Sequence, residues 1–143
     1  MCFGKSLARR AGYTVYNSSI LLTRKGNMEM INVAVVEEEE HYREELKQIL
    51  DLEEGVKLLG VCENGREICV LMKKCRPDMV FIGVTPPQAY GLDLARRFKE
   101  IPFEDILVVL MSEDRNHGLE AFNLEVFDFI LKPLKGERVK KSL

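Results

Sequence analysis

The chain has 143 residues, of which 46% are hydrophobic and 31% charged, and its formal net charge is −2. This length and apolar content describe one globular domain with a core and exclude a second domain. Residues 1 to 30 hold five basic residues against one acidic residue, which leaves a net charge of about −6 for residues 31 to 143. An acidic domain gains little from the counterion release that drives nucleic-acid binding, so we expect protein partners and no direct nucleic-acid contact.

Cysteine usage and hydropathy indicate the cellular compartment. Cys2, Cys62, Cys69 and Cys75 lack the paired C-x-x-C spacing of zinc or redox sites, so we interpret them as buried or incidental thiols. No apolar run approaches the ~20 residues of a membrane span, and no secretory signal is recognisable. The sequence therefore predicts a cytoplasmic protein without a membrane contact.

The first 30 residues differ from the rest of the chain. They lack the alternation of strand and helix patterns that begins at residue 31, so we expect residues 1–30 to be a leader that is non-native or poorly ordered. Gly4-Lys5-Ser6 resembles the end of a phosphate-binding loop, but the required glycine five residues earlier, after a strand, is missing. We expect the domain itself to span residues 31–143.

From residue 31 onward, short β-branched apolar runs alternate with amphipathic stretches, a pattern typical of βα units in a parallel sheet. Five strands are predicted, at residues 31–36, 57–62, 79–84, 106–111 and 127–131. Helices are predicted between them at residues 42–52, 67–74, 92–99 and 115–122, where apolar residues recur at spacings of three and four. Because crossovers in such units are right-handed, helices should cover both faces of the sheet.

Several short motifs lie where these strands begin or end, and together they carry a family resemblance. The first strand runs into Glu37-Glu38, Arg76-Pro77-Asp78 precedes the third, and the fifth ends in Lys132-Pro133. A helix starts at Gly91-Leu92-Asp93. In this order and spacing the chain resembles the receiver domains of bacterial response regulators, over about residues 31 to 141.

The resemblance implies a CheY-like fold. This is an α/β, flavodoxin-like, doubly wound sheet of five parallel strands in the order 2-1-3-4-5, with three α/β/α layers and a site at the carboxyl ends of the strands. It also implies a role in two-component phosphorelay signalling rather than an enzyme's role.

Gly83 stands where the family has its phospho-accepting aspartate. A glycine has no carboxylate to attack phosphorus, so the resemblance implies a degenerate member, a pseudo-receiver. Glu37 and Glu38 keep the charge of the acidic pair with longer side chains. Because Mg²⁺ demands near-ideal octahedral geometry, we expect weak magnesium binding or none at Glu37 and Glu38.

Other site positions follow from the same resemblance. Lys132 is retained and should pair with Glu37 or Glu38, and Pro133 should follow a cis peptide bond. Met111 is predicted at the place of the hydroxyl that senses the phosphoryl group, with Ser112 one residue beyond as the alternative. Phe129 lies at the aromatic switch position, or is an ordinary, partly exposed aromatic.

The remaining polar candidates are given structural roles. Thr85 should form a turn hydrogen bond. His41 and His117 are flanked by charge and lack a partner at a recognisable spacing, so we interpret both as solvent-facing. Glu39 and Glu40 are well placed at a helix N-terminus, where negative charge is favourable.

The last residues begin like the family's fifth helix and then stop, so we expect a short or truncated last helix. Apolar surface near the fourth and fifth strands would then favour a homodimer. We therefore expect a phosphorylation-independent protein-interaction and dimerisation module. The alternative is an active phospho-receiver that uses an unexpected acceptor or retains magnesium; a flavodoxin-like enzyme would need a glycine-rich phosphate loop after a strand.

Overall fold

The computed structural model describes residues 14–15, 21–22, 30–85, 90–100 and 106–143. Most of the leader, with Cys2 and the Gly4-Lys5-Ser6 motif, lies outside these ranges. Within the leader, two short strands pair antiparallel, which the sequence did not predict. These strands are β1 (Thr14–Val15) and β2 (Leu21–Leu22).

Five parallel strands form the central sheet of the described chain, in the spatial order β4-β3-β5-β6-β7. This is the predicted order 2-1-3-4-5, and the predicted fold class is confirmed. The strands are β3 (Ile31–Val36), β4 (Val56–Cys62), β5 (Met79–Val84), β6 (Leu107–Ser112) and β7 (Asp128–Leu131).

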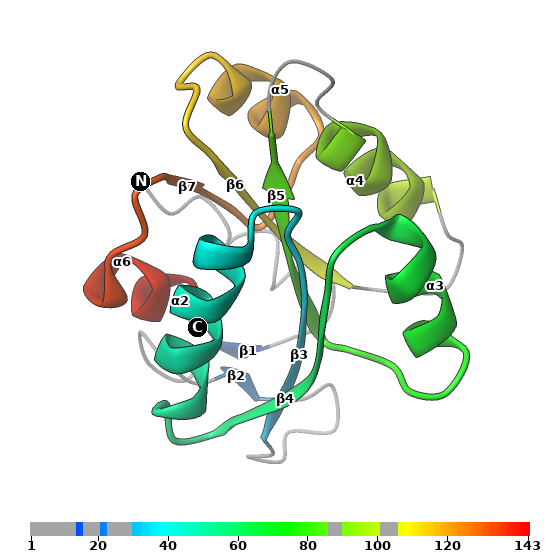
Figure 1. Cartoon of the computed structure of the whole chain (residues 1–143), viewed down its shortest axis with the longest axis vertical. Coiled ribbons are helices and arrows are strands. Elements are labelled where there is room, and N and C mark those ends of the chain that lie inside the picture. The colour runs from blue at the N-terminus through cyan, green and yellow to red at the C-terminus, as the bar shows by residue number, and fades with distance from the viewer. Residues whose placement is uncertain (1–13, 16–20, 23–29, 86–89, 101–105) are drawn as a thin grey trace.

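Helices cover both faces of this sheet (Figure 1). They are α2 (Glu40–Asp51), α3 (Gly65–Met72), α4 (Tyr90–Glu100), α5 (His117–Asn123) and α6 (Gly136–Ser142). Helices α2 and α6 pack on one face through Leu46, Leu50 and Val139. Helices α3, α4 and α5 pack on the other, through residues such as Ile68 and Phe98.

The core lies on both sides of β5 and β6, whose residues are all buried. Alternate residues of one strand therefore enter different apolar clusters: Phe81 packs with α2 and Val80 with α4. Such two-sided burial is expected for central strands of a parallel sheet.

Two expectations about the chain's last third are wrong. The fourth predicted strand ends at Ser112 and not at Met111. The short last helix also does not expose β6, because Val139 and Leu143 at the end of the chain are themselves buried in the core. Large apolar side chains are exposed on α5 instead, at Leu119 and Phe122, with 69% and 62% exposed.

Candidate functional site

The carboxyl ends of the parallel strands bring the predicted site residues together. Glu37 directly follows β3, Gly83 is the penultimate residue of β5, Ser112 ends β6 and Lys132 directly follows β7. This edge also contains the point where the chain order reverses, between β3 and β5, which is where doubly wound sheets place their sites.

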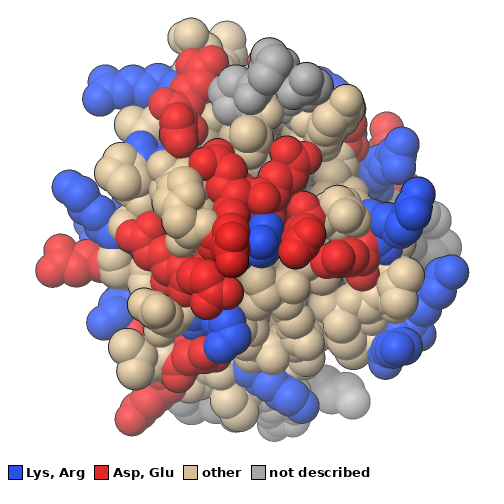
Figure 2. Space-filling view, viewed as in Figure 1, with Lys and Arg blue, Asp and Glu red and all other residues tan. Residues whose placement is uncertain are grey.

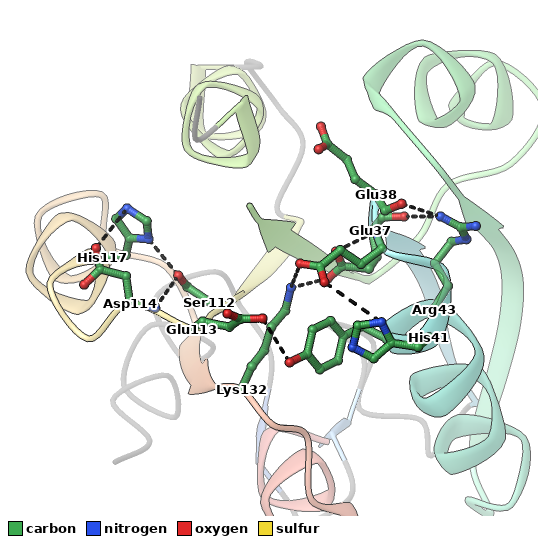
Figure 3. A network of polar contacts seen from close by, with 11 residues as sticks. Glu37, Glu38, His41, Arg43, Ser112, Glu113, Asp114, His117 and Lys132 are labelled. Carbon is green, nitrogen blue, oxygen red and sulfur yellow. Dashed lines mark hydrogen bonds and ion pairs between the residues drawn. The ribbon is translucent and has the colours of Figure 1, made fainter. Parts of the chain in front are cut away.

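A buried ion pair between Lys132 and Glu37 forms the centre of the site (Figure 3). Lys132 Nζ lies 2.9 Å from Glu37 Oε2, and both side chains are 0% exposed. Neither of these two atoms makes a well-aligned hydrogen bond to the described residues. The backbone N–H of Glu39 donates to the other carboxylate oxygen, Glu37 Oε1, at 3.2 Å. The predicted pairing of Lys132 with the acidic pair is thus present, and Glu37 is the member that provides it.

Gly83 faces the carboxylate of Glu37. A Cβ atom added at Gly83 would overlap Cδ and both carboxylate oxygens of Glu37. Two residues on neighbouring strands thus share one space, because β3 and β5 pair through Val36 and Ile82 immediately before them. The side chain of Glu37 occupies the space that Gly83, which has no side chain, leaves open.

Tyr42, on the first turn of α2, covers Lys132. Lys132 Nζ lies 4.2 Å from the centre of the Tyr42 ring, a cation–π arrangement. The Tyr42 hydroxyl donates to Glu113 Oε1 at 3.1 Å, which connects α2 to the loop after β6. Burial of this phenol, with the acceptor Glu113 beside it, raises the pKa of Tyr42 to about 12.

The loop after β3 is held by Arg43. Its Nη1 donates to the backbone carbonyl oxygens of Glu37 and Glu38, at 2.9 Å and 2.8 Å. Its Nη2 lies 3.5 Å from the carboxylate of Glu63, directly after β4. Arg43 on α2 therefore fixes the backbone at Glu37 and Glu38.

Ser112 and His117 form a second polar contact at the edge of the site. Ser112 is fully buried, its hydroxyl is 2.7 Å from His117 Nδ1, and it accepts the backbone N–H of Asp114 at 3.0 Å. His117 Nε2 lies 3.9 Å from Asp114 Oδ2, and the His117 side chain is only 12% exposed. The interpretation of His117 as solvent-facing is therefore wrong, whereas His41 is 67% exposed.

Met111 does not reach the polar site. Its side chain is fully buried in the apolar cluster beneath α2, while the next residue, Ser112, is the last of the strand. Of the two candidates for the hydroxyl position, Ser112 is the one at the strand end. The apolar run from Leu107 to Met111 had concealed this one-residue difference.

The other predicted residues lie around this centre. Phe129 is half-buried, and its ring lies 3.6 Å from where a Cβ of Gly118 on α5 would stand. The peptide bond between Lys132 and Pro133 is cis, as predicted. Thr85 Oγ1 is buried without a hydrogen-bond partner among the described residues, so the predicted turn bond is not seen there.

Exposed acidic residues surround the buried pair. Glu38 and Glu40 follow β3, Glu63 follows β4 and Glu113 follows β6, and all four are exposed. Figure 2 shows acidic side chains gathered in the middle of the face that Figure 1 presents. Glu38 therefore faces solvent and takes no part in the pairing with Lys132.

Sequence reasoning missed three residues of this site. Tyr42 carried a signal only as part of an apolar helix face, and nothing in the sequence pointed to its contact with Lys132. Glu113 and His117 belong to a loop and the first turn of a short helix. Their partners, Tyr42 and Ser112, could be recognised only once the strand ends were placed side by side.

The three described cysteines and the described helices add no further site. Cys62 is buried, Cys69 exposed and Cys75 intermediate, and each of these three is a free thiol. No cluster of metal-ligating side chains occurs in the described part of the chain. Within the same ranges, every helix is too short or too polar to cross a bilayer.

Two curated relatives match most of this chain. An uncharacterized response regulatory protein of Yersinia pestis is 31% identical over 114 residues, which are 80% of this chain and 47% of that protein. The sensory transduction protein LytT of Oceanobacillus iheyensis is 29% identical over 79% of this chain and 46% of its own. The chain thus spans less than half the length of these relatives.

Solved structures match over a similar range. The response regulatory domain of mrkE from Klebsiella pneumoniae superposes with a TM-score of 0.68 at 26% identity, covering 78% of this chain and 91% of that domain. The response regulator TrrA from Thermotoga maritima, solved in complex with Mg²⁺ and BeF, gives a TM-score of 0.63 at 26% identity, covering 80% of this chain and 100% of that chain. The family model for the response regulator receiver domain matches residues 33–143, so the chain belongs to the receiver domains of response regulators.

Proposed function

We propose that this receiver domain is degenerate at its phosphorylation site and acts as a phosphorylation-independent protein-interaction and dimerisation module of a two-component signalling protein. The observation that carries the proposal is the end of β5. Gly83 stands there, and the carboxylate that faces Lys132 comes instead from Glu37, directly after β3. A module of this kind regulates by contact and catalyses no reaction.

Phosphorylation requires a nucleophilic carboxylate that can reach a donor. Gly83 supplies none, and Glu37 is 1% exposed, with one carboxylate oxygen against Lys132 and the other accepting the N–H of Glu39. Attack by Glu37 would require this pair to separate first. Glu37 is nevertheless the acceptor that the alternative, an active phospho-receiver, would have to use.

The residues present do not fit a magnesium site. Mg²⁺ prefers an octahedral set of oxygens with one or two carboxylates. Glu37 is occupied by the ammonium group of Lys132, Gly83 has no side chain, and only Glu38 presents an exposed carboxylate on the loop after β3. Weak magnesium binding or none follows from this set.

Helix α5 offers a surface for self-association. Leu119 and Phe122 lie one turn apart on it and are 69% and 62% exposed. Large exposed apolar side chains that adjoin one another favour a protein contact. A concentration-dependent dimer in sedimentation velocity, weakened by Leu119→Glu and unchanged by Leu52→Glu at the far end of α2, would support this face. A monomer at all concentrations would remove the dimer from the proposal.

The central claim is tested by phosphoryl uptake. The protein is incubated with Mg²⁺ and acetyl phosphate, beside a receiver domain that has an acceptor aspartate, and intact masses are compared. We expect the aspartate-containing control to gain a phosphoryl group and this protein to remain unchanged. Stable uptake that is lost in Glu37→Gln would overturn the proposal and establish the alternative acceptor.

A further inference from the structure

We propose that Glu37 replaces, from the neighbouring strand, the carboxylate missing at position 83, so that the chain's own side chain permanently fills the site. This inference rests on the proposed degeneracy of the site and explains what stabilises it. The site then needs a carboxylate at one of positions 37 and 83 and excludes carboxylates at both.

Steric exclusion is the first support. The backbone of Gly83 does not adopt the left-handed conformation that favours glycine, in contrast to Gly55 with its φ of +81°. The backbone at position 83 would therefore accept a side chain. The atoms that oppose one belong to the carboxylate of Glu37. A side chain at position 83 therefore requires Glu37 to leave that space.

Electrostatics is the second support. Lys132 Nζ and Glu37 Oε2 are 2.9 Å apart, in side chains that are both fully buried. A buried charge without its partner is strongly unfavourable, because neither water nor another ion compensates it. Glu39 Oε1 lies 3.8 Å from Lys132 Nζ, but that side chain is 29% exposed and is a weaker partner. Lys132 therefore depends on a buried carboxylate, whichever strand provides it.

Closure of the site is the third support. The Tyr42 ring lies over Lys132, and the hydroxyl of Tyr42 is bonded to Glu113 in the loop after β6. The pair is thus covered by α2 on one side while Glu37 fills the space beside β5. A ligand can shift a conformational equilibrium only through a difference in its binding to the two states. The carboxylate of Glu37 already occupies the space next to Gly83, so regulation of this site falls to protein contacts.

The test moves the carboxylate from one strand to the other. Glu37→Ala/Gly83→Asp is compared with Glu37→Ala/Gly83→Ala by equilibrium urea unfolding. Both variants lack Glu37 and carry a Cβ at position 83, so they differ only in the carboxylate. We expect the unfolding equilibrium constant of the aspartate variant to be lower by roughly tenfold or more, the coupling typical of side chains in direct contact.

Single substitutions sharpen the result. Gly83→Asp alone should destabilise the domain, because two carboxylates then compete for one lysine. The control Glu38→Ala, at the exposed neighbouring glutamate, should not relieve that loss. Equal stabilities of the two double variants, an aspartate double variant that does not fold, or a Gly83→Asp protein as stable as the parent would each overturn the inference.

The proposed function is judged separately, by phosphoryl uptake of the unaltered protein. Uptake there would contradict the degenerate receiver whatever the unfolding data show. If the protein takes up no phosphoryl group and the two double variants are equally stable, the proposal of a degenerate receiver holds and only the proposed role of Glu37 is wrong.

Discussion

Two ion pairs at opposite ends of β7 differ in how completely their buried carboxylates are hydrogen-bonded. Asp128, at the start of β7, is 0% exposed and accepts four hydrogen bonds: two from Arg138, one from the hydroxyl of Ser142 and one from the backbone N–H of Phe129. Their lengths run from 2.6 to 2.8 Å. Glu37 and Lys132 are equally buried, yet their 2.9 Å contact is not a well-aligned hydrogen bond.

The difference separates a pair that attaches a helix to the sheet from a pair whose hydrogen bonding is incomplete. Asp128 and Arg138 attach α6 to β7 with two parallel N–H···O bonds, a geometry that fixes position. Lys132 instead holds a point charge among a carboxylate, an aromatic ring and the more distant Glu39. Such an arrangement suits a residue that, in the receiver family, pairs with a group arriving from outside the chain. In the proposed arrangement that group is the chain's own Glu37.

The largest predicted effect comes from removing the lysine. Lys132→Met should lower the free energy of unfolding by about 3–5 kcal/mol, because Glu37 is left as an uncompensated buried charge. Adding Glu37→Gln should recover much of this loss, since the remaining side chain is then neutral. Chemical denaturation measures both. An unchanged stability in Lys132→Met would show that the pair is already separated in solution.

The pair at the other end of β7 should tolerate its loss better. Arg138→Met should cost roughly 1–3 kcal/mol, because Asp128 keeps the bonds from Ser142 and Phe129 and the Arg138 side chain is 22% exposed. Hydrogen exchange should show faster opening of α6 with little change in α2. Arg97→Met, at an exposed arginine on α4, is the matched control. If Arg138→Met lost as much stability as Lys132→Met, the proposed distinction between the two ion pairs would be wrong.

The fold could be predicted from the sequence because its signals are local. The strands at Ile31–Val36 and Met79–Val84 were predicted with their observed bounds, since both are apolar runs rich in β-branched residues that end before a polar residue. The end of β6 was missed because Ser112 continues the strand after an unbroken apolar run. The starts of α2, α3 and α4 were predicted late, in α2 because Glu40 and His41 carry no apolar periodicity, whereas the start of α5 was predicted early.

Only part of the site's membership could be predicted from the sequence. Local motifs identified Glu37, Gly83 and Lys132, and the pairing of Lys132 with the acidic pair was expected. That Glu37 rather than Glu38 enters the core, and that it fills the space of Gly83, depends on the register between β3 and β5. The contact of Tyr42 with Lys132 joins residues 90 positions apart and leaves no trace in the sequence.

The smallest predicted effect isolates the cover over the lysine. Tyr42→Phe keeps the ring and removes only the hydrogen bond to Glu113, so the loss should be about 0.5–1.5 kcal/mol at neutral pH. The pKa of Tyr42 in the folded protein is about 12, above its ordinary value of 10.0, mainly through burial. The folded state therefore favours the protonated phenol. That stabilisation is complete below pH 10 and is lost as the pH rises towards 12.

The parent should consequently lose stability more steeply than Tyr42→Phe over this alkaline range, as measured by urea unfolding at a series of pH values. Tyr90→Phe, at a tyrosine that is 63% exposed, should follow the parent. Identical pH dependence in Tyr42→Phe and the parent would mean that the phenol is accessible to water, and that the site around Lys132 is open on the side of α2. The cover by Tyr42 would then no longer distinguish the Glu37–Lys132 pair from the Asp128–Arg138 pair. Only the incomplete hydrogen bonding of Glu37 would remain to separate them.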